Sequence, residues 1–289
     1  MRKAPSQHFA DMSQAPVPER IRYVRAGAFF ETSAIRALRD RLDELIREPV
    51  DCENKLVFIT APAGMGLTRI IKQFAAQHPP KTSRRLGTHT VPLVNQLIHP
   101  SGNFIDYCDA LRTNLDVPGY GAMTRQSSYP KTLELLGHLK TRLVILEDFH
   151  RAYSFQKHQL ISYQNYVHYL ISEYDIRVIL TGAPRIWRWA LEDEQTLGRS
   201  VHLQYRAWTP SEDDFIEFLE GFERWWPVRE EGSLSRDPKL RKAIISRTHG
   251  ICKNVMQVLT GLAIYAIVSG SERLDFDTWM SFRDQGLSI

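Results

Sequence analysis

Hydrophobic residues in the first two thirds of the chain form short continuous runs, separated by stretches in which they recur at helical spacing. The runs at residues 56–59, 143–146 and 177–180 have the length of buried strands, and a fourth candidate lies around residues 90–94. Apolar residues at helical spacing follow the first run, at Ile70, Ile71 and Phe74. Strands that alternate with helices predict a parallel sheet covered by helices on both faces.

The two ends of the chain have different patterns. Residues 1–20 are polar, contain proline and show no clear period, so we expect a flexible N-terminal arm. Beyond about residue 208 the pattern becomes wholly helical, which predicts a small helical lid with segments at 211–224, 236–247, 250–269 and 275–283. The expected divisions are the arm over 1–20, an α/β domain over 21–207 and the lid over 208–289.

The turn after the first predicted strand, at residues 61–68, is similar to a phosphate-binding loop of the form G-x-x-x-x-G-K-[ST]. In such a loop backbone N–H groups surround the phosphates, the lysine reaches the outer phosphates and the hydroxyl holds Mg²⁺. Gly66 and Thr68 occupy the second-glycine and hydroxyl positions, whereas Ala61 replaces the first glycine and Leu67 replaces the lysine. A chance strand-to-helix turn rich in Gly and Ala is the alternative. The residues expected to bind ATP with Mg²⁺ are Ala63, Gly64, Met65, Gly66, Leu67 and Thr68.

A second element supports the phosphate loop. The strand at 143–146 ends in Glu147 and Asp148, the reverse of the usual Asp-Glu order. At a magnesium-nucleotide site one acid orients the metal and its water, and the other polarises the attacking water. A strand that ends in solvated charges is the alternative, but the loop and the acids together favour a P-loop fold. Without the lysine, hydrolysis should suffer more than binding does.

Composition sets broader limits. The 289 residues carry a formal net charge of +4, which permits nucleic acid as a partner without demanding it. The three cysteines form no C-x-x-C pair, so we expect reduced thiols in a cytoplasmic protein and no zinc site. The N-terminus has no apolar segment of a signal peptide. The longest apolar stretch, at 255–268, is interrupted by polar residues, and we expect it not to span a membrane.

The order of these parts resembles the TniB/TnsC family of AAA+ transposition regulators over roughly residues 18–281. The stretches that carry the resemblance are residues 19–21, 63–66 followed by Thr68, 143–150, 178–184, 197–199, 217–219 and 222–223. The resemblance implies an AAA+ fold and a homo-oligomer that assembles on double-stranded DNA under the control of ATP. It also implies two protein partners, a transposase and a target-selection protein of the TniQ type.

The resemblance also implies roles for individual residues. Thr68 would face Mg²⁺, Glu147 would match the metal-orienting acid, and Asp148 would match the catalytic acid. Thr181 matches the polar residue that senses the γ-phosphate at the end of the fourth strand. Arg199 matches the arginine that reaches the nucleotide of a neighbouring subunit. Lys253 matches the basic sensor residue of the lid.

Candidate DNA contacts are basic residues that would bind phosphates without reading bases. Lys81, Arg84 and Arg85 form the densest basic run. Arg125 and Lys131 precede the acidic strand, where proteins of this kind project loops toward DNA. Basic residues of this sort can equally be ordinary solvated surface.

The loop and the acidic strand end predict a P-loop fold, and the resemblance implies an AAA+ regulator of DNA transposition that oligomerises on DNA and links the transposase to a target-selection protein. ATP hydrolysis is expected to be weak or absent because Leu67 replaces the lysine. One alternative is an active DNA-dependent AAA+ ATPase or remodeller in which another cation substitutes for the lysine. A third reading is a scaffold that keeps the fold and works without nucleotide.

Overall fold

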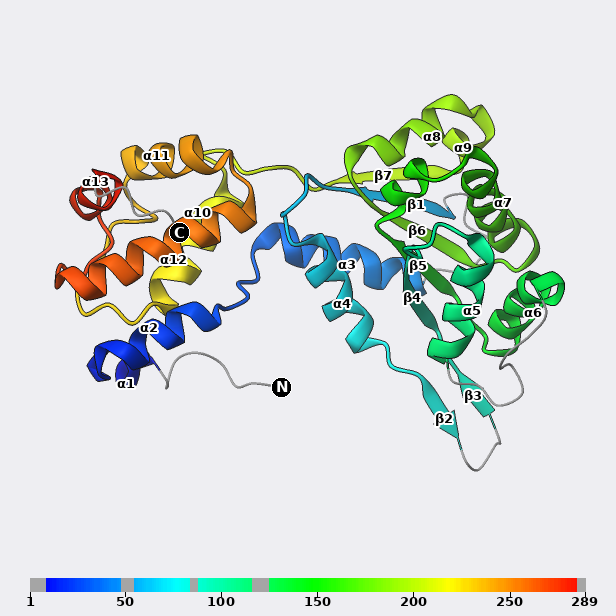
Figure 1. Ribbon diagram of the computed structural model, residues 1–289, viewed down its shortest axis with the longest axis horizontal. Helices are drawn as coiled ribbons and strands as arrows, with labels where there is room; N and C mark the ends of the chain where they lie inside the picture. The colour runs from blue at the N-terminus through cyan, green and yellow to red at the C-terminus, as the bar shows by residue number, and fades with distance from the viewer. Residues whose placement is uncertain (1–8, 48–54, 84–87, 116–124, 285–289) are drawn as a thin grey trace. The chain divides into compact units, whose positions relative to one another are not determined.

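The computed structural model describes residues 9–47, 55–83, 88–115 and 125–284, which form two compact units (Figure 1). One unit comprises residues 39–206, and the other combines the chain up to Leu38 with the chain from Ala207 onward. The helices of the first unit are α4 (Leu67–Gln77), α5 (Phe104–Leu115), α6 (Arg125–His138), α7 (Lys157–Glu173), α8 (Arg188–Glu192) and α9 (Glu194–Gly198). Two 3-10 helices, η1 (Phe149–Ser154) and η2 (Pro184–Trp187), lie between them in the chain, and α3 (Ser33–Arg47) contributes residues to both units.

A five-stranded parallel sheet forms the centre of the first unit. Its strands are ordered β4 (Leu93–Leu97), β5 (Leu143–Glu147), β6 (Arg177–Gly182), β1 (Leu56–Thr60) and β7 (Ser200–Gln204). Figure 1 shows α3 and α4 on one side of this sheet and α5, α6 and α7 on the other. Every residue of β1, β5 and β6 is buried, as expected for strands covered on both faces. The predicted parallel sheet with flanking helices is confirmed.

The strand expected around residues 90–94 is placed differently. The sheet strand is β4, at Leu93–Leu97, whereas β3 (Thr88–Thr90) pairs antiparallel with β2 (Lys81–Ser83) in a separate hairpin. Pro92 lies between β3 and β4 and has no backbone N–H, and its carbonyl accepts from the N–H groups of Arg142 and Leu143. The proline thus divides one apolar run into two strands of different sheets.

The second unit is helical, as the predicted lid requires. Its helices are α1 (Phe9–Gln14), α2 (Val17–Ala26), α10 (Asp213–Trp225), α11 (Pro238–Thr248), α12 (Cys252–Ser269) and α13 (Phe276–Asp284). The α11–α12 turn uses the left-handed residues His249 and Gly250. A Cβ on Gly250 would lie 2.1 Å from the carbonyl oxygen of Trp208, so this close turn requires glycine.

The prediction of a flexible arm over residues 1–20 is wrong for its last residues. Helix α2 begins at Val17, and Arg20 on this helix is fully buried. The Arg20 guanidinium donates from Nε to the carbonyl oxygen of Pro227 at 2.8 Å and from Nη1 to Glu272 at 2.8 Å. A polar sequence favours a solvated segment, but the buried Arg20 holds this one to the loops that follow α10 and α12, where its two partners lie. Residues 1–8 lie outside the described part of the chain.

Helix α12 also differs from expectation in one respect. Among the described residues it is the one helix long and apolar enough to cross a membrane by length and composition, although the interrupted run was expected to be too short and too polar. One such helix is weak evidence for a membrane span, because a core helix of similar composition passes the same test. The residues of α12 that enter the core of the second unit are Val255, Leu259, Leu262, Ala263, Ala266 and Ile267.

Candidate functional site

The loop between β1 and α4 has the backbone of an anion-binding turn. Gly64 and Gly66 adopt positive φ angles of 89° and 84°, which glycine tolerates best. The loop is closed by a hydrogen bond from the Met65 N–H to the Pro62 carbonyl at 3.3 Å, and its first residue, Ala61, donates to the Gly182 carbonyl of β6 at 3.0 Å. Helix α4 starts directly after Gly66, so its unsatisfied N–H groups and positive dipole end lie at this turn.

In and just after the loop, the larger apolar side chains are buried or half-buried and the threonine side chain is exposed. Met65 is buried, Leu67 is half-buried, and Thr68 is exposed in the first turn of α4. A Cβ built on Gly66 would meet no atom within 4 Å, so the space beside this residue is open. The geometry fits an anion held by backbone N–H groups, with no positive side chain at position 67.

Glu147 ends β5 with its carboxylate turned inward. It is 4% exposed, and its Oε1 accepts from Nδ2 of Asn95 on β4 at 2.6 Å. Its Oε2 is buried and has no partner among the described residues. Burial raises the pKa of Glu147, while the Asn95 amide, the Lys72 ammonium and the Thr68 hydroxyl act in the opposite direction. An unpaired carboxylate oxygen beside a threonine hydroxyl fits the oxygen ligands that Mg²⁺ prefers.

The described residues contain no cluster of three or more His, Cys, Asp or Glu side chains able to hold a metal ion. Mg²⁺ needs no such cluster, since it usually binds through one or two carboxylates, several waters and the phosphates of a substrate. Thr68 and Glu147, which the sequence assigned to the metal, are thus brought together by the fold in a way that suits this ion.

Asp148 is placed differently from Glu147. It has left the strand, adopts a left-handed conformation with φ 57° and ψ 36°, and directly precedes η1. Its Oδ2 lies 3.4 Å from Nε of Arg151, and its Oδ1 lies 3.9 Å from Nδ1 of His150. The two acids therefore face different surroundings, since Glu147 is buried beside α4 while Asp148 is engaged with Arg151.

Thr181 lies in β6. In the sheet this strand lies between β1, which precedes the loop, and β5, which ends in Glu147. It is buried and pairs in register with Ile59 of β1. His150 fastens the end of β6, since its Nδ1 accepts from the Ala183 N–H at 3.4 Å. Burial lowers the pKa of His150, which favours the neutral imidazole that can accept this bond. The structure thus brings Thr181 to the same sheet edge as Glu147.

Sequence reasoning missed two supporting residues, Asn95 and Lys72. Asn95 lies in β4, the strand that was placed too early, and a polar residue within that apolar strand was the available signal. Lys72 lies on α4 four residues after Thr68, and its spacing could have shown that the two share a face.

Arg199 is not brought to this site within the chain. Its carbonyl accepts from the N–H of Leu56, and the next residue, Ser200, pairs with Leu56 at the amino end of β1. The loop follows the carboxyl end of β1, about 13 Å further along the strand at about 3.3 Å per residue. Arg199 is exposed at the opposite edge of the sheet, away from the loop of its own chain. Lys253 is exposed in the first turn of α12, in the other unit.

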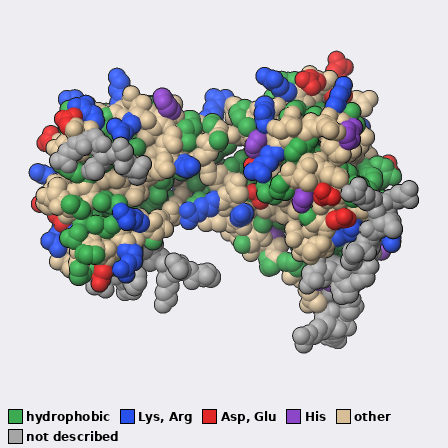
Figure 2. Space-filling model, in the orientation of Figure 1, with side chains coloured by type: hydrophobic (Ala, Val, Ile, Leu, Met, Phe, Trp, Pro, Cys, Tyr) green, Lys and Arg blue, Asp and Glu red, His purple; other side chains and the backbone are tan. Residues whose placement is uncertain are grey.

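The candidate DNA contacts are only partly described. Lys81 is exposed in β2, and Lys131 is exposed on α6. Arg84 and Arg85 lie outside the described residues, as does the side chain of Arg125 at the start of α6. On the face shown in Figure 2, Lys and Arg side chains occur over both units rather than over a single element.

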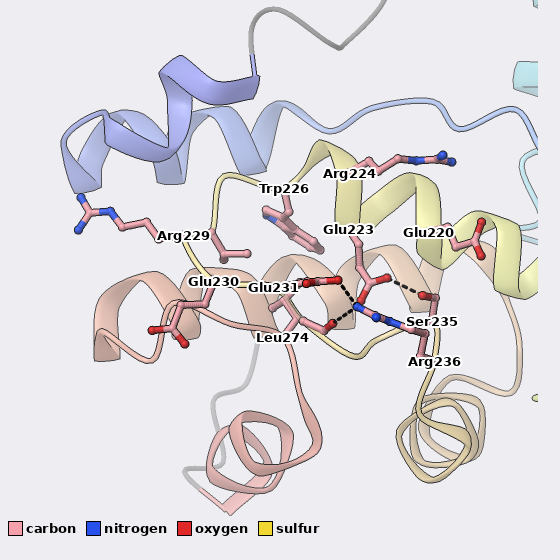
Figure 3. Close-up of a pocket in the computed structure, with 12 residues that line it drawn as sticks. Glu220, Glu223, Arg224, Trp226, Arg229, Glu230, Glu231, Ser235, Arg236 and Leu274 are labelled. Atoms are coloured by element: carbon pink, nitrogen blue, oxygen red, sulfur yellow. Dashed lines mark hydrogen bonds and ion pairs between the residues drawn. The ribbon is translucent and has the colours of Figure 1, made fainter.

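A pocket in the helical second unit (the C-terminal unit) contains none of the predicted site residues. It has a volume of about 500 Å³ and lies beside the end of α10 and the loop that follows (Figure 3). Glu223 is already used within the protein, since its carboxylate accepts from the Leu234 N–H and the Ser235 hydroxyl, each at 2.6 Å. Glu231 pairs with Arg236. We therefore interpret these charges as fastening the loop and assign the pocket no ligand.

A Glu147→Gln variant is expected to melt at a higher temperature than the wild type at pH 7 without nucleotide. The folded pKa of Glu147 is raised above its ordinary value of 4.5, so ionisation of this side chain costs folding free energy at neutral pH. The cost falls as the pH drops through the folded pKa and vanishes below the unfolded one, so the two melting curves should converge in acid.

Glu134→Gln on the exposed face of α6 is the matched control and should not change the melting temperature. A lower melting temperature for Glu147→Gln at pH 7 would contradict this prediction. It would show that the interactions of the ionised carboxylate stabilise the fold by more than the burial of its charge costs. In a second arm, Mg²⁺ with ATP should stabilise the wild type more than Glu147→Gln.

The fold and the loop define a P-loop protein of the AAA+ class. The chain is similar to the Orc2 protein of Aeropyrum pernix, solved in ADPNP–ADP complexes, with TM-score 0.57 and 15% identity, covering 88% of this chain and 68% of that one. It is similar to Cdc6p of Pyrobaculum aerophilum, with TM-score 0.56 and 12% identity, covering 96% and 72%. A chain of Drosophila ORC bound to DNA has TM-score 0.59 and 8% identity, covering 100% and 70%. At these identities the likeness shows the fold alone.

The family follows from the sequence match. The family described as bacterial TniB protein matches residues 20–210, well over half of the chain. The protein therefore belongs to the TniB family. No curated protein matches the chain significantly.

Proposed function

We propose that this TniB-family protein is a regulator of DNA transposition that oligomerises on double-stranded DNA and links a transposase to a target-selection protein of the TniQ type. The family match over residues 20–210 is the observation that carries the proposal. The AAA+ fold supports it, and one similar protein, Drosophila ORC, was solved bound to DNA. The exposed Lys81 and Lys131 are proposed phosphate contacts, as are Arg84, Arg85 and Arg125.

The nucleotide part of the proposal is that the loop after β1 binds ATP with Mg²⁺. The open N-terminus of α4, the two left-handed glycines and the unpaired Oε2 of Glu147 support this site. When bound, Mg²⁺ would neutralise charge on the phosphates. Thr68 and Glu147 would hold the ion, and Ala63, Gly64, Met65, Gly66 and Leu67 would supply backbone to the phosphates.

Hydrolysis is proposed to be weak or absent for two reasons. Leu67 brings no positive charge to the outer phosphates, where such a charge stabilises the transition state. Asp148, the proposed catalytic acid, is engaged with Arg151 rather than presented freely to a water. Thr181 remains the proposed γ-phosphate sensor, and Lys253 the proposed basic sensor of the lid. The protein would then respond to bound ATP without rapid turnover.

The proposed oligomer uses Arg199 to contact the nucleotide of the adjacent subunit. The position of this exposed side chain, at the sheet edge opposite the loop of its own chain, supports a role between subunits. An Arg199→Ala variant should therefore bind ATP normally as a monomer and lose assembly. Arg188→Ala at the exposed start of α8 is the matched control.

The test combines electron microscopy with ATP turnover. Purified protein is imaged with double-stranded DNA in the presence of ATP, ADP or no nucleotide, and phosphate release is followed in parallel. We expect ordered assemblies on DNA that need ATP, weaken at high salt and release phosphate slowly. Assemblies that form equally well without nucleotide would instead support a scaffold, and turnover at an ordinary AAA+ rate would support an active ATPase.

A further inference from the structure

The exposed side of α4 next to the loop forms a groove that carries positive charge. Gly66, Thr68, Arg69, Lys72 and Gln73 line it, together with Ala76. The buried residues of α4 are Ile70, Ile71 and Phe74, on the other side of the helix. The groove therefore continues from the open turn of the loop along the solvent face of the helix.

Lys72 lies in this groove one helical turn beyond Thr68. Residues four apart lie on the same face, about 6 Å apart along the axis. Side chains on a helix lean toward its N-terminus, so Lys72 leans toward the turn that carries Thr68, and its four-carbon stem is long and flexible. The Lys72 ammonium also lies close enough to the Glu147 carboxylate to interact with it electrostatically.

No hydrogen bond or ion pair joins the exposed Lys72 side chain to another described residue, and its ammonium is thus available to a ligand. Arg69 lies about 100° around the axis from Thr68, whereas Lys72 lies about 40° from it. Leu67, at the position where a P-loop lysine stands, carries no charge. Lys72 is therefore the cation of this helix best aligned with the Thr68 side of the site.

We propose that Lys72 supplies the positive charge to the outer phosphates of the nucleotide that Leu67 cannot supply. The inference rests on the proposed binding of ATP by this loop. Lys72 stands on a flexible stem and at a different angle from a P-loop lysine, so it increases affinity without fixing the phosphates for reaction. The site then binds ATP tightly enough to control assembly while turnover stays slow.

Isothermal titration calorimetry with ATP, ADP and AMP, each with Mg²⁺, tests this role in the full chain. Lys72→Ala should weaken ATP binding about tenfold, weaken ADP binding less and leave AMP binding unchanged, because only the outer phosphates lose a partner. Lys72→Arg should retain most of the affinity. Leu67→Lys in the Lys72→Ala background should restore ATP binding.

Lys157→Ala, at the exposed start of α7, removes the same charge elsewhere and should leave all three affinities unchanged. If the wild type bound none of the nucleotides, the proposed nucleotide site itself would be wrong. If the wild type bound ATP and Lys72→Ala bound it equally well, the role of Lys72 would be wrong while the site stood. An equal loss for ATP, ADP and AMP, or a lowered melting temperature, would assign Lys72 a structural role and overturn the inference.

Discussion

An Arg20→Ala variant is expected to lose about 3–5 kcal/mol of unfolding free energy in the C-terminal unit, the loss typical when one partner of a buried ion pair is removed. Arg20 is fully buried, and the Glu272 side chain is only 13% exposed. The substitution would leave the Glu272 carboxylate and the Pro227 carbonyl without their donor. Urea unfolding followed by circular dichroism measures the loss.

The pH dependence of this effect has a definite sign. The hydrogen bond from Arg20, followed by its charge, lowers the pKa of Glu272 below its ordinary value of 4.5. The stabilisation is therefore fully present when the pH is above the pKa that Glu272 has in the unfolded protein. It is lost as the pH falls through the lower pKa that Glu272 has in the folded protein. Wild type and Arg20→Ala should differ most at neutral pH and less in acid.

Arg25→Ala provides the control for Arg20, because Arg25 is exposed on the same helix. It should change the unfolding free energy by no more than about 0.5 kcal/mol, the range of ordinary surface substitutions. Equal stabilities for Arg20→Ala and Arg25→Ala would contradict the anchoring of α2 by Arg20. Helix α2 would then not be a fixed part of the C-terminal unit.

A Gly66→Val variant is expected to weaken ATP binding about a hundredfold. Gly66 has a φ of 84°, a conformation that costs a β-branched residue roughly 1–3 kcal/mol. The strained loop should relax to another backbone, and the N–H groups at the start of α4 would no longer converge on one phosphate. Each tenfold loss of affinity corresponds to about 1.4 kcal/mol, so the strain and the lost contacts together account for the effect.

Calorimetry with Mg²⁺ and ATP measures this loss, with Gly137→Ala as the control. Gly137 lies in α6 without a positive φ, and a Cβ there would be in ordinary contact with Tyr174 at 3.5 Å. The Gly137→Ala variant should therefore bind ATP with the same affinity as the wild type. If Gly66→Val bound ATP as tightly as the control, the loop would not be the nucleotide site.

Parts of this protein could be predicted from sequence because their signals are local. The runs that became β1, β5 and β6 are continuous and apolar, and such a run must be buried on both faces wherever it lies. Gly66 and Thr68 could be proposed as site residues because a strand, a glycine turn and a helix are consecutive in the chain. Glu147 could be proposed for the same reason, at the end of an apolar strand.

Other parts depend on contacts between residues far apart in the chain. Asn95 meets Glu147 only because β4 pairs with β5, and the strand itself was misplaced because Pro92 divides the apolar run. Asp148 and Glu147 are adjacent in sequence, yet the chain turns between them and gives them different partners. No local pattern records which of two neighbouring acids will be buried.

The sequence alone determined the alternation of strands and helices around β1, β5 and β6, the loop with Leu67 in place of a lysine, and the acidic strand end. These follow from hydrophobic period and backbone preference, which act over a few residues. The tertiary structure alone decided that Arg20 is a buried anchor, that the charge of Lys72 acts on the Glu147 carboxylate and that Arg199 stands at the opposite sheet edge from the loop. Burial and charge pairing depend on which distant residues meet, and only the packed chain specifies that.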